Sequence, residues 1–579
     1  MTKHTTYALL LPILAMGWNT AGAQINNNVV EVENSYRPTV KDADKLDVLP
    51  QVERKQTSHY DVDYDVTMLT TDKYAPQPLF SVRADQIVTG VPRDFLTFNV
   101  GNRGIFNARG AFGLKLSDAD RMDLDLSLRR HSSNVEDPLK TTEKGEWLSN
   151  VLTLKGALDY EHRLSPLSSI LFNGGAEYQT LYYGPFAYLA PQVNHPVVSE
   201  NEVDKKQKNT LANLGVRLTP YDFGRLILGG HVGFTMFDQS FISNDIASPL
   251  SNHEMQAMAG MDASVKLAET QTLGIGIDAQ SSSYGYEGFA NNNSFTLRPH
   301  YDARTGRCLL TVGALFYRTW GLTHEWKVAP DLQLKVHASP KVDISASLSG
   351  GEVRNDYRHF QDMTPYWHVT SFVDPYAGCK NVNDGQLVNQ FDQLRAKAAV
   401  EWNPTNRIFL SLGGGYEASA DRAEMFADGR LFTADGSHAH FDAEFKYYGN
   451  EWFRLNAKLQ CNSWSTDAEG ILGDNATAWR PVIDLRADTR LRIVRNLYFG
   501  ADLLMQTFEK GSKLYYERPD IADVGCSLAF KMPFDKERLD GGALSVYARI
   551  DNVLNQKYDL YNMYRCFGSS ILIGTALTF

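Results

Sequence analysis

The segment Arg121-Met-Asp-Leu-Asp-Leu-Ser-Leu-Arg129 alternates apolar and polar residues without interruption. In an extended strand, successive side chains point to opposite faces. The aliphatic side chains of this segment therefore share one face, and the charged or hydroxyl side chains share the other. Such a strand separates an apolar solvent from a polar one, so the segment predicts a strand with lipid on one side and water on the other.

The same pattern recurs along the chain from Phe95 to Phe579. We count about 22 such strands and accept an even number between about 18 and 24. A sheet in a soluble protein rarely exceeds about ten strands, whereas a closed barrel leaves no strand edge unpaired in lipid. We therefore predict an all-β fold, a transmembrane antiparallel β-barrel over residues 94–579 with a polar lumen.

The first residues predict export from the cytoplasm. Lys3 and His4 precede the apolar run 7–18, and Ala21-Gly22-Ala23 is a small-residue cleavage site. This is the pattern of a signal peptide over residues 1–23. The apolar run is too short to cross about 30 Å of hydrocarbon as a helix. Together with the strand pattern, it predicts a location in the cell outer membrane, with the lipid bilayer as the main partner.

Short turns alternate with longer polar segments along the predicted barrel. In outer-membrane barrels the short turns face the periplasm and the long loops face the exterior. The segments expected as extracellular loops are 132–148, 182–207, 237–253, 353–392, 465–477 and 554–568. Cys379 and Cys566 fall in two of these loops, and whether they form a disulfide bridge stays open.

Composition and motifs exclude some classes of protein. The formal net charge of −11 argues against nucleic acid as a partner. The chain has no Gly-x-Ser-x-Gly, no His-Glu-x-x-His, no phosphate loop and no dinucleotide fingerprint. These are the local signatures of common hydrolases, metalloproteases and nucleotide enzymes. We therefore predict that the protein is not an enzyme and needs no cofactor.

Charged side chains occupy the predicted lumen face, where oppositely charged neighbours on adjacent strands would hold the wall rigid. Two interpretations stay open: an ion- or sugar-selective lining, or the ordinary chemistry of a water-filled lumen. His438, His440 and Asp442 share a face, but an ion would need a third ligand brought in by the fold, so we predict no metal. The predicted lumen-lining residues are Asp123, Asp125, Arg129, His438, His440, Asp442, Glu444, Lys446, Arg454, Lys458, Asp484, Arg486 and Asp488.

The segment 353–392 is unusually aromatic for a solvated loop. Such side chains either bind a partner or ligand, or fold into the barrel mouth and close it. The predicted recognition residues of this extracellular loop are His359, Phe360, Tyr366, Trp367 and His368.

Residues 24–93 lack the alternation and are rich in proline. We predict a periplasmic extension or a partial lumen insert. Within it, Tyr36, Arg37, Pro38 and Asp42 form a linear motif that suits docking to a periplasmic partner, because an exposed linear motif needs no fold of its own.

Both ends of the chain resemble known barrels. The segment Asp551-Asn-Val-Leu-Asn-Gln-Lys-Tyr-Asp-Leu560 and the final strand Ile571-Leu-Ile-Gly-Thr-Ala-Leu-Thr-Phe579 resemble the end of TonB-dependent receptors. The segment 31–45, with Tyr36-Arg-Pro-Thr-Val, is similar to the start of related Bacteroidota barrels. The resemblance implies a 22-strand barrel, and Phe579 is expected to be the signal that the outer-membrane assembly machinery reads.

The chain also departs from that family. TonB-dependent receptors carry a folded plug domain before the first strand, and the roughly 70 residues of 24–93 are too few for it. The resemblance therefore implies a plug-less type. Two functions remain: a passive or partner-gated channel or receptor for small solutes or nutrients, or a non-transporting assembly subunit that docks periplasmic or surface proteins.

Overall fold

The computed structural model describes residues 94–137, 145–182, 206–241, 250–285, 289–367, 382–383, 386–425, 431–449, 452–468, 477–510, 517–534, 542–561 and 564–579. The predicted signal peptide, the 24–93 extension and its docking motif lie outside these residues, as do His368 and Cys379.

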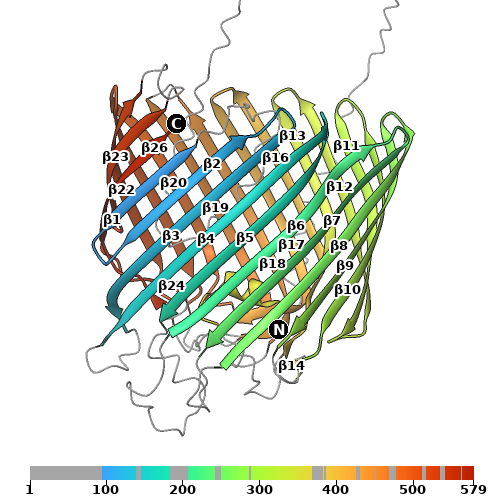
Figure 1. Cartoon of the computed structure of the whole chain (residues 1–579), viewed down its shortest axis with the longest axis horizontal. Coiled ribbons are helices and arrows are strands. Elements are labelled where there is room, and N and C mark those ends of the chain that lie inside the picture. Colours follow the sequence, from blue (N-terminus) through green and yellow to red (C-terminus); the bar gives the residue numbers. More distant parts are fainter. Residues whose placement is uncertain are drawn as a thin grey trace, which may run out of the picture. The chain divides into compact units, whose positions relative to one another are not determined.

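Twenty-two strands form one antiparallel sheet (Figure 1). Each strand pairs with its neighbours in the chain, and β1 pairs with the last strand, β26, which closes the sheet into a barrel. The strands are β1 Phe95–Gly101, β2 Phe106–Lys115, β3 Asp120–Glu136, β4 Glu146–Ser165, β5 Ser168–Tyr182, β6 Lys206–Asp222, β7 Leu226–Phe241, β8 Leu250–Ala268, β9 Gln271–Tyr284, β10 Asn292–Arg304, β11 Cys308–Gly321, β12 Trp326–Ser339, β13 Val342–Val353, β16 Gln390–Thr405, β17 Ile408–Met425, β18 Leu431–Tyr448, β19 Phe453–Thr466, β20 Pro481–Val494, β21 Leu497–Phe508, β22 Ile521–Pro533, β23 Ala543–Asp551 and β26 Ser570–Thr578. The predicted fold class and strand number are confirmed.

The outer face of the barrel is apolar because the alternation places every second side chain there. Leu126, Val232 and Phe441 are 48%, 62% and 49% exposed. In a soluble protein, exposed aliphatic and aromatic side chains on nearly every strand would cost solubility. In a bilayer they are the lipid-facing surface, and the opposite face of each strand lines the lumen.

Strands extend further at the long-loop end than the sequence suggested. β3 continues to Glu136 and β4 starts at Glu146, within the segment 132–148 that was expected as a loop. β7 and β8 likewise extend into 237–253. Beyond the bilayer both faces of a strand meet water, so the alternation stops while backbone pairing continues, as in Asn134 opposite Leu148. The loop limits predicted there were wrong for this reason.

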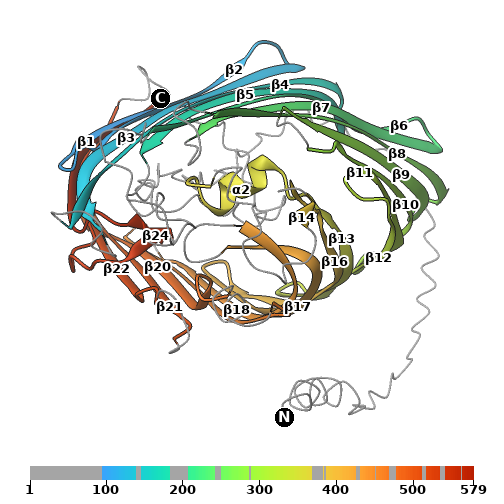
Figure 2. The same ribbon diagram turned by 90° about the horizontal axis from the view of Figure 1, so that it is seen from below.

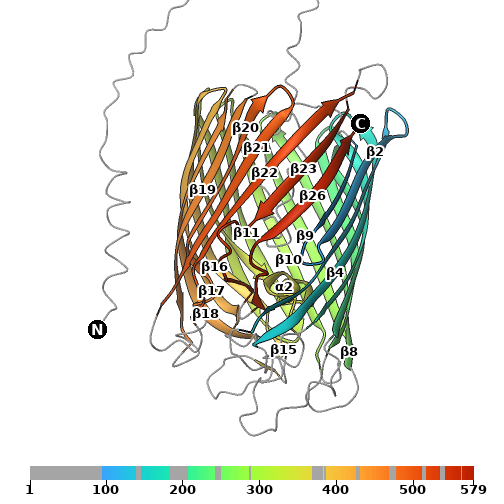
Figure 3. The ribbon, with the colours of Figure 1, turned by 90° about the vertical axis from the view of Figure 1, so that its left-hand side faces the viewer.

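One sector of the wall is shorter than the rest. We call β1, β2, β23 and β26, which are neighbours around the closure, the seam sector. They have 7, 10, 9 and 9 residues, whereas the other barrel strands have 12 to 20. Figure 3 shows β23 ending and β26 beginning part-way along the wall, whereas the neighbouring β22 is longer.

Small elements lie inside the ring at the long-loop end. They are helix α2 Tyr357–Met363 and the two-stranded pairs β14 Val382–Asn383 with β15 Gln386–Leu387, and β24 Asp559–Tyr561 with β25 Tyr564–Arg565. Figure 2 shows α2 within the ring of strands. No helix among the described residues combines the length and apolarity needed to cross a membrane.

Candidate functional site

A segment of the chain enters the lumen after β13. We call Arg354–Trp367 the lumen strap. Its helix α2 begins after Asp356, whose side chain accepts a hydrogen bond from the His359 N–H at 2.8 Å, as is usual for a helix N-cap. The helix ends at Thr364, before Pro365, which cannot continue the hydrogen-bond ladder. The strap is thus a short, defined helix and not an irregular loop.

Aromatic side chains of the strap pack against the inner wall. Phe360 and Trp367 are almost completely buried, with ring centroids 5.4 Å apart. Trp367 also stacks on Phe237 of β7 at 6.0 Å, and Leu431 of β18 completes the cluster. Burying such side chains contributes about 1.5–3 kcal/mol each, so the strap is held in the lumen mainly by its aromatic residues.

Arg354 fixes the start of the strap. Its guanidinium donates to the Gln280 and Asn292 carbonyl oxygens at 3.1 and 3.0 Å. It also donates to the Ser282 and Ser294 hydroxyls at 2.9 and 2.8 Å. Burial lowers the pKa of Arg354, yet its two terminal NH2 groups make four hydrogen bonds to strands β9 and β10. The planar fork of arginine suits this geometry, which a lysine would not reproduce.

A row of uncharged amides binds the other end of the strap. Gln361 of α2 donates to the Gln179 side chain of β5 at 2.7 Å and accepts from Asn209 of β6 at 3.1 Å. Gln207 donates to the Pro365 carbonyl at 3.2 Å, and Gln239 donates to the Trp367 carbonyl at 3.1 Å. These wall residues are polar but neutral, so they hold the strap without placing an unpaired charge in a dry contact.

A carboxylate of β8 holds the first turn of α2. Glu254 is buried and accepts from the Tyr357 N–H at 2.8 Å. Gln256, two residues further along β8, donates to Asp356 at 3.3 Å. On the opposite side, the Asn355 side chain donates to the Val388 carbonyl at 2.6 Å. The strap therefore contacts wall segments from both sides of the lumen.

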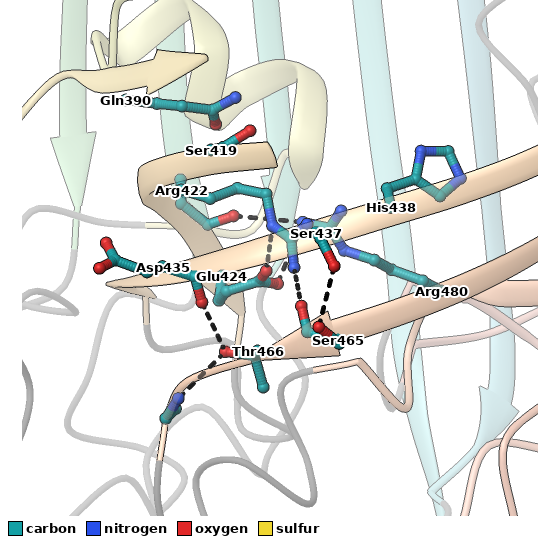
Figure 4. A network of polar contacts seen from close by, with 12 residues as sticks. Gln390, Ser419, Arg422, Glu424, Asp435, Ser437, His438, Ser465, Thr466 and Arg480 are labelled. Carbon is teal, nitrogen blue, oxygen red and sulfur yellow. Dashed lines mark hydrogen bonds and ion pairs between the residues drawn. The ribbon is translucent and has the colours of Figure 1, made fainter. Parts of the chain in front are cut away.

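A buried ion-pair network lies beside the strap (Figure 4). Glu424 of β17 has no exposed surface and pairs with Arg422 at 2.5 Å and with Arg480 at 3.0 Å. Arg480 lies over the rings of Trp464 and Trp479, 4.5 and 4.8 Å from their centroids. Burial lowers the pKa of Arg480, while Glu424 partly offsets that effect. Because Arg422 and Arg480 both pair with Glu424, their charges together offset the free-energy cost of burying its carboxylate.

The network continues to a predicted lumen residue. His438 stacks on Trp464 at 3.6 Å with an interplanar angle of 3°, and its Nε2 lies 2.9 Å from the Asn462 side chain. Trp479 packs against the aromatic cluster of the strap. A continuous set of contacts therefore runs from the strap through Trp479 and Arg480 to Trp464 and His438.

Most predicted lumen-lining residues lie opposite the lipid-facing side chains, and many are paired. Asp125 pairs across strands with Arg109 at 2.6 Å, as expected. More often the pair lies within one strand at positions two residues apart. Such pairs are Arg121–Asp123, Lys446–Glu444 and Arg486–Asp484, at 2.9, 2.9 and 2.8 Å. Asp488 accepts from Asn456 at 3.0 Å, and Asp442 lies 3.3 Å from His440.

The remaining predicted residues lie on barrel strands or where the sheet closes. Arg129 of β3 lies opposite Asn107, and Arg454 and Lys458 of β19 lie opposite Tyr448 and Glu444. Phe579 and Asp94 exchange backbone hydrogen bonds at 3.1 and 2.9 Å. The role of Phe579 in assembly stays a prediction. Within the described ranges, no three His, Cys, Asp or Glu side chains are grouped to hold a metal ion.

The predicted recognition residues belong to the strap or border it. Phe360 and Trp367 pack against the wall as described. Tyr366 stacks on Tyr564 at 3.5 Å, and burial raises its pKa. His359 is the half-buried member of α2, and burial lowers its pKa. Sequence reasoning missed the wall residues that bind the strap, although they are five amides and one carboxyl group at inward positions of β5 to β8: Gln179, Gln207, Asn209, Gln239, Gln256 and Glu254.

The sequence matches no protein-family model and no curated protein. Solved structures nevertheless share the fold. The FrpB iron transporter from Neisseria meningitidis has a TM-score of 0.62 at 11% identity, over 84% of this chain and 81% of that chain. The ferric-catecholate import receptor Fiu from E. coli K12 gives 0.58 at 9% over the same shares. The siderophore receptor PiuA from Acinetobacter baumannii gives 0.58 at 8%, over 84% and 82%.

Fold and site together define a closed 22-strand β-barrel of the outer membrane, with a polar lumen that a strap enters. At these identities the likeness concerns the fold. That fold is the barrel of TonB-dependent siderophore receptors.

Proposed function

We propose that the protein is a partner-gated channel or receptor for small solutes or nutrients, in which the lumen strap is the gate. The observation that carries the proposal is that Arg354–Trp367 contacts wall segments on both sides of the lumen through separate, individually modest hydrogen bonds. Each such bond is worth about 0.5–1.5 kcal/mol net. A ligand or partner that binds the displaced strap more tightly can therefore shift its position.

The comparisons support transport as the class. The neighbours include an iron transporter and two siderophore-linked receptors, and FpvAI was solved in complex with pyocin S2, a protein partner. Residues 24–93 are proposed as a plug-less N-terminal extension that a periplasmic partner engages through Tyr36, Arg37, Pro38 and Asp42.

Single-channel conductance in a planar bilayer tests the proposal. The intact protein is compared with a deletion of residues 24–93 and with Arg354→Ala plus Gln361→Ala, which loosens the strap. We expect low conductance in the intact protein and larger, fluctuating conductance in the double variant. The matched control is Arg358→Ala, an exposed residue of the same helix, which should behave as the intact protein.

The alternative is a non-transporting assembly subunit. The observation that favours it is the extent of aromatic packing inside the ring, where Val135, Trp147, Phe432 and Tyr564 form a second buried cluster. Silence of all these variants in the bilayer would reject the gate and favour this alternative, which crosslinking in cells would then pursue.

A further inference from the structure

The seam sector just spans the hydrocarbon of a membrane. A strand advances about 3.3 Å per residue, and barrel strands tilt by about 35–45°. The nine residues of β23 and β26 therefore rise about 23 Å along the membrane normal, close to the roughly 25 Å apolar band of outer-membrane barrels, and the seven residues of β1 rise about 18 Å. The longer strands elsewhere continue past this band. At the seam, the strand wall ends where the outer-leaflet headgroups begin.

A segment outside the 22-stranded sheet, which includes the β24–β25 pair, lies at the long-loop end of the seam sector. We call residues 552–561 and 564–569 the seam panel. Backbone contacts join it to β22, where the Val553 N–H donates to the Val524 carbonyl at 2.9 Å. On the β3 side, side chains make the contacts: Lys557 lies 2.8 Å from Glu136, and the ring centroids of His131 and Phe567 lie 4.5 Å apart.

The seam carries an apolar surface up to its top edge. Val553 and Leu554 of the panel are 45% and 60% exposed. Next to the panel in the chain, Ile571 and Ile573 are exposed on the lipid-facing side of β26. This surface is of the kind that acyl chains cover.

Two cations lie at the same edge. Arg130 is exposed on the lipid-facing side of β3, opposite Phe106 and one row above Leu128. Arg103 lies in the turn between β1 and β2, and its carbonyl accepts from the Ser132 N–H at 3.0 Å, two residues beyond Arg130. Within the described part of the chain, neither arginine side chain has an ion pair or a hydrogen bond.

Unpaired arginines at this height require an anion. An arginine facing lipid is costly at the bilayer centre but tolerated at the interface, where its stem stays in the apolar layer and its head meets water or phosphate. Guanidinium groups bind phosphate oxygens through paired hydrogen bonds. Cations directly above an apolar surface match an amphiphile that has a phosphate head and acyl chains.

We propose that the seam sector and seam panel bind an anionic lipid of the outer leaflet. Arg103 and Arg130 hold its phosphate, and its acyl chains lie along Val553, Leu554 and Ile571. The site faces the bilayer and not the lumen, so it does not depend on what the barrel transports. The bound lipid covers the barrel at the seam sector, where the strands of the wall are shortest.

Native mass spectrometry of the detergent-purified full chain tests this, with diphosphoryl lipid A as the probe and phosphatidylcholine as the neutral comparison. Each arginine near a membrane surface contributes roughly fivefold in affinity, so Arg103→Gln plus Arg130→Gln should weaken lipid A binding about thirtyfold. Arg225→Gln plus Arg307→Gln, two exposed arginines of short turns, is the matched control and should retain binding. All four residues lie in turns or face outward, and retained folding is checked by circular dichroism.

The outcomes separate a lipid from a free anion. Leu554→Ser should weaken lipid A binding severalfold, whereas Leu167→Ser, in the exposed turn between β4 and β5, should not. Equal affinity in the Arg103/Arg130 variant and the control would overturn the proposal. So would complete displacement of lipid A by millimolar inorganic phosphate, because that result would define a simple phosphate site.

Discussion

Arg480 and Glu424 form an ion pair 3.0 Å long in which the carboxylate has no exposed surface and is shared with Arg422. Strand β17 and the segment before β20 meet at this pair. Because Trp464 and Trp479 cover the Arg480 guanidinium, water cannot replace a lost partner. The pair is therefore a sensitive point of the lumen wall.

Glu424→Gln should destabilise the barrel by about 3–5 kcal/mol, because it leaves two arginines without their common carboxylate. Guanidinium-induced unfolding in detergent micelles measures this change. Glu444→Gln is the matched control, since that carboxylate pairs with Lys446 and is 28% exposed, and we expect at most about 1 kcal/mol. Equal midpoints for the two variants would contradict the role of burial.

Arg354→Ala should release the start of the lumen strap, because four hydrogen bonds to β9 and β10 are lost together. Hydrogen exchange followed by mass spectrometry should show at least about tenfold faster exchange in residues 355–367, which corresponds to about 1.4 kcal/mol of local stability. Arg354→Lys should resemble the alanine variant, because the ammonium cannot reach four acceptors. Unchanged exchange would mean that the aromatic packing alone holds the strap.

Protonation of His359 should loosen the strap. Burial lowers the pKa of His359, while Asp356 and Asp362 partly offset this and Arg480 adds to it. The neutral imidazole is therefore favoured in the folded strap. Its contribution is complete above the ordinary histidine pKa of about 6.5 and is lost as the pH falls through that value. Glu254, which accepts from the Tyr357 N–H, acts with the opposite sign, because burial raises its pKa to about 8. The effect of His359 is therefore measured against the His359→Gln variant: from about pH 7.5 to about pH 5.5, exchange of residues 355–367 should accelerate more in the intact protein, once corrected for intrinsic rates.

His359→Gln separates this effect from the carboxylates. Burial raises the pKa of Asp362, so the stability tied to Asp362 changes with the opposite sign, falling as the pH rises above its ordinary value of 3.8. In the His359→Gln variant the acid-induced loosening should largely disappear. If it persists, another group is responsible.

Cys566 should be unreactive in the folded protein. It is a free thiol, 4% exposed, in a cluster with Leu504, Phe508, Ile521 and Tyr558. Maleimide labelling should therefore be slow under native conditions and fast after denaturation. Intact mass measured with and without reductant should show no bridge between Cys379 and Cys566. A mass gain of two protons on reduction would show that a bridge had formed.

The sequence predicted the barrel because alternation is imposed by the bilayer itself. Wherever a strand crosses lipid, as in Met122 to Leu128, the pattern is visible and the strand was found. Above the bilayer this constraint ends, so the outer parts of β3 and β4 were taken for a loop. The sequence indicated that these residues are polar and lie outside the bilayer, but it did not indicate that they continue the strands.

The candidate site was predicted only in part. The aromatic residues of 353–392 indicated that this segment either recognises a ligand or closes the mouth, and Phe360 and Trp367 are buried inside the ring. Their partners could not be found, because Gln179 and Gln361 are 182 positions apart and only the closed sheet brings them together. Charge pairs two residues apart within a strand, such as Arg486 with Asp484, could have been read from the sequence, because such residues share a face.

The pairing of β1 with β26 places Leu96 opposite Leu577. This pairing determines when the barrel can close during folding. No closed sheet exists until the last nine-residue strand has been synthesised and aligned with the first. Until that moment the outer edges of β1 and β26 are unpaired, and they must be prevented from pairing with strands of other chains. Contacts of such sequence separation form slowly, so we expect the pairing of β1 with β26 to be a late step of folding.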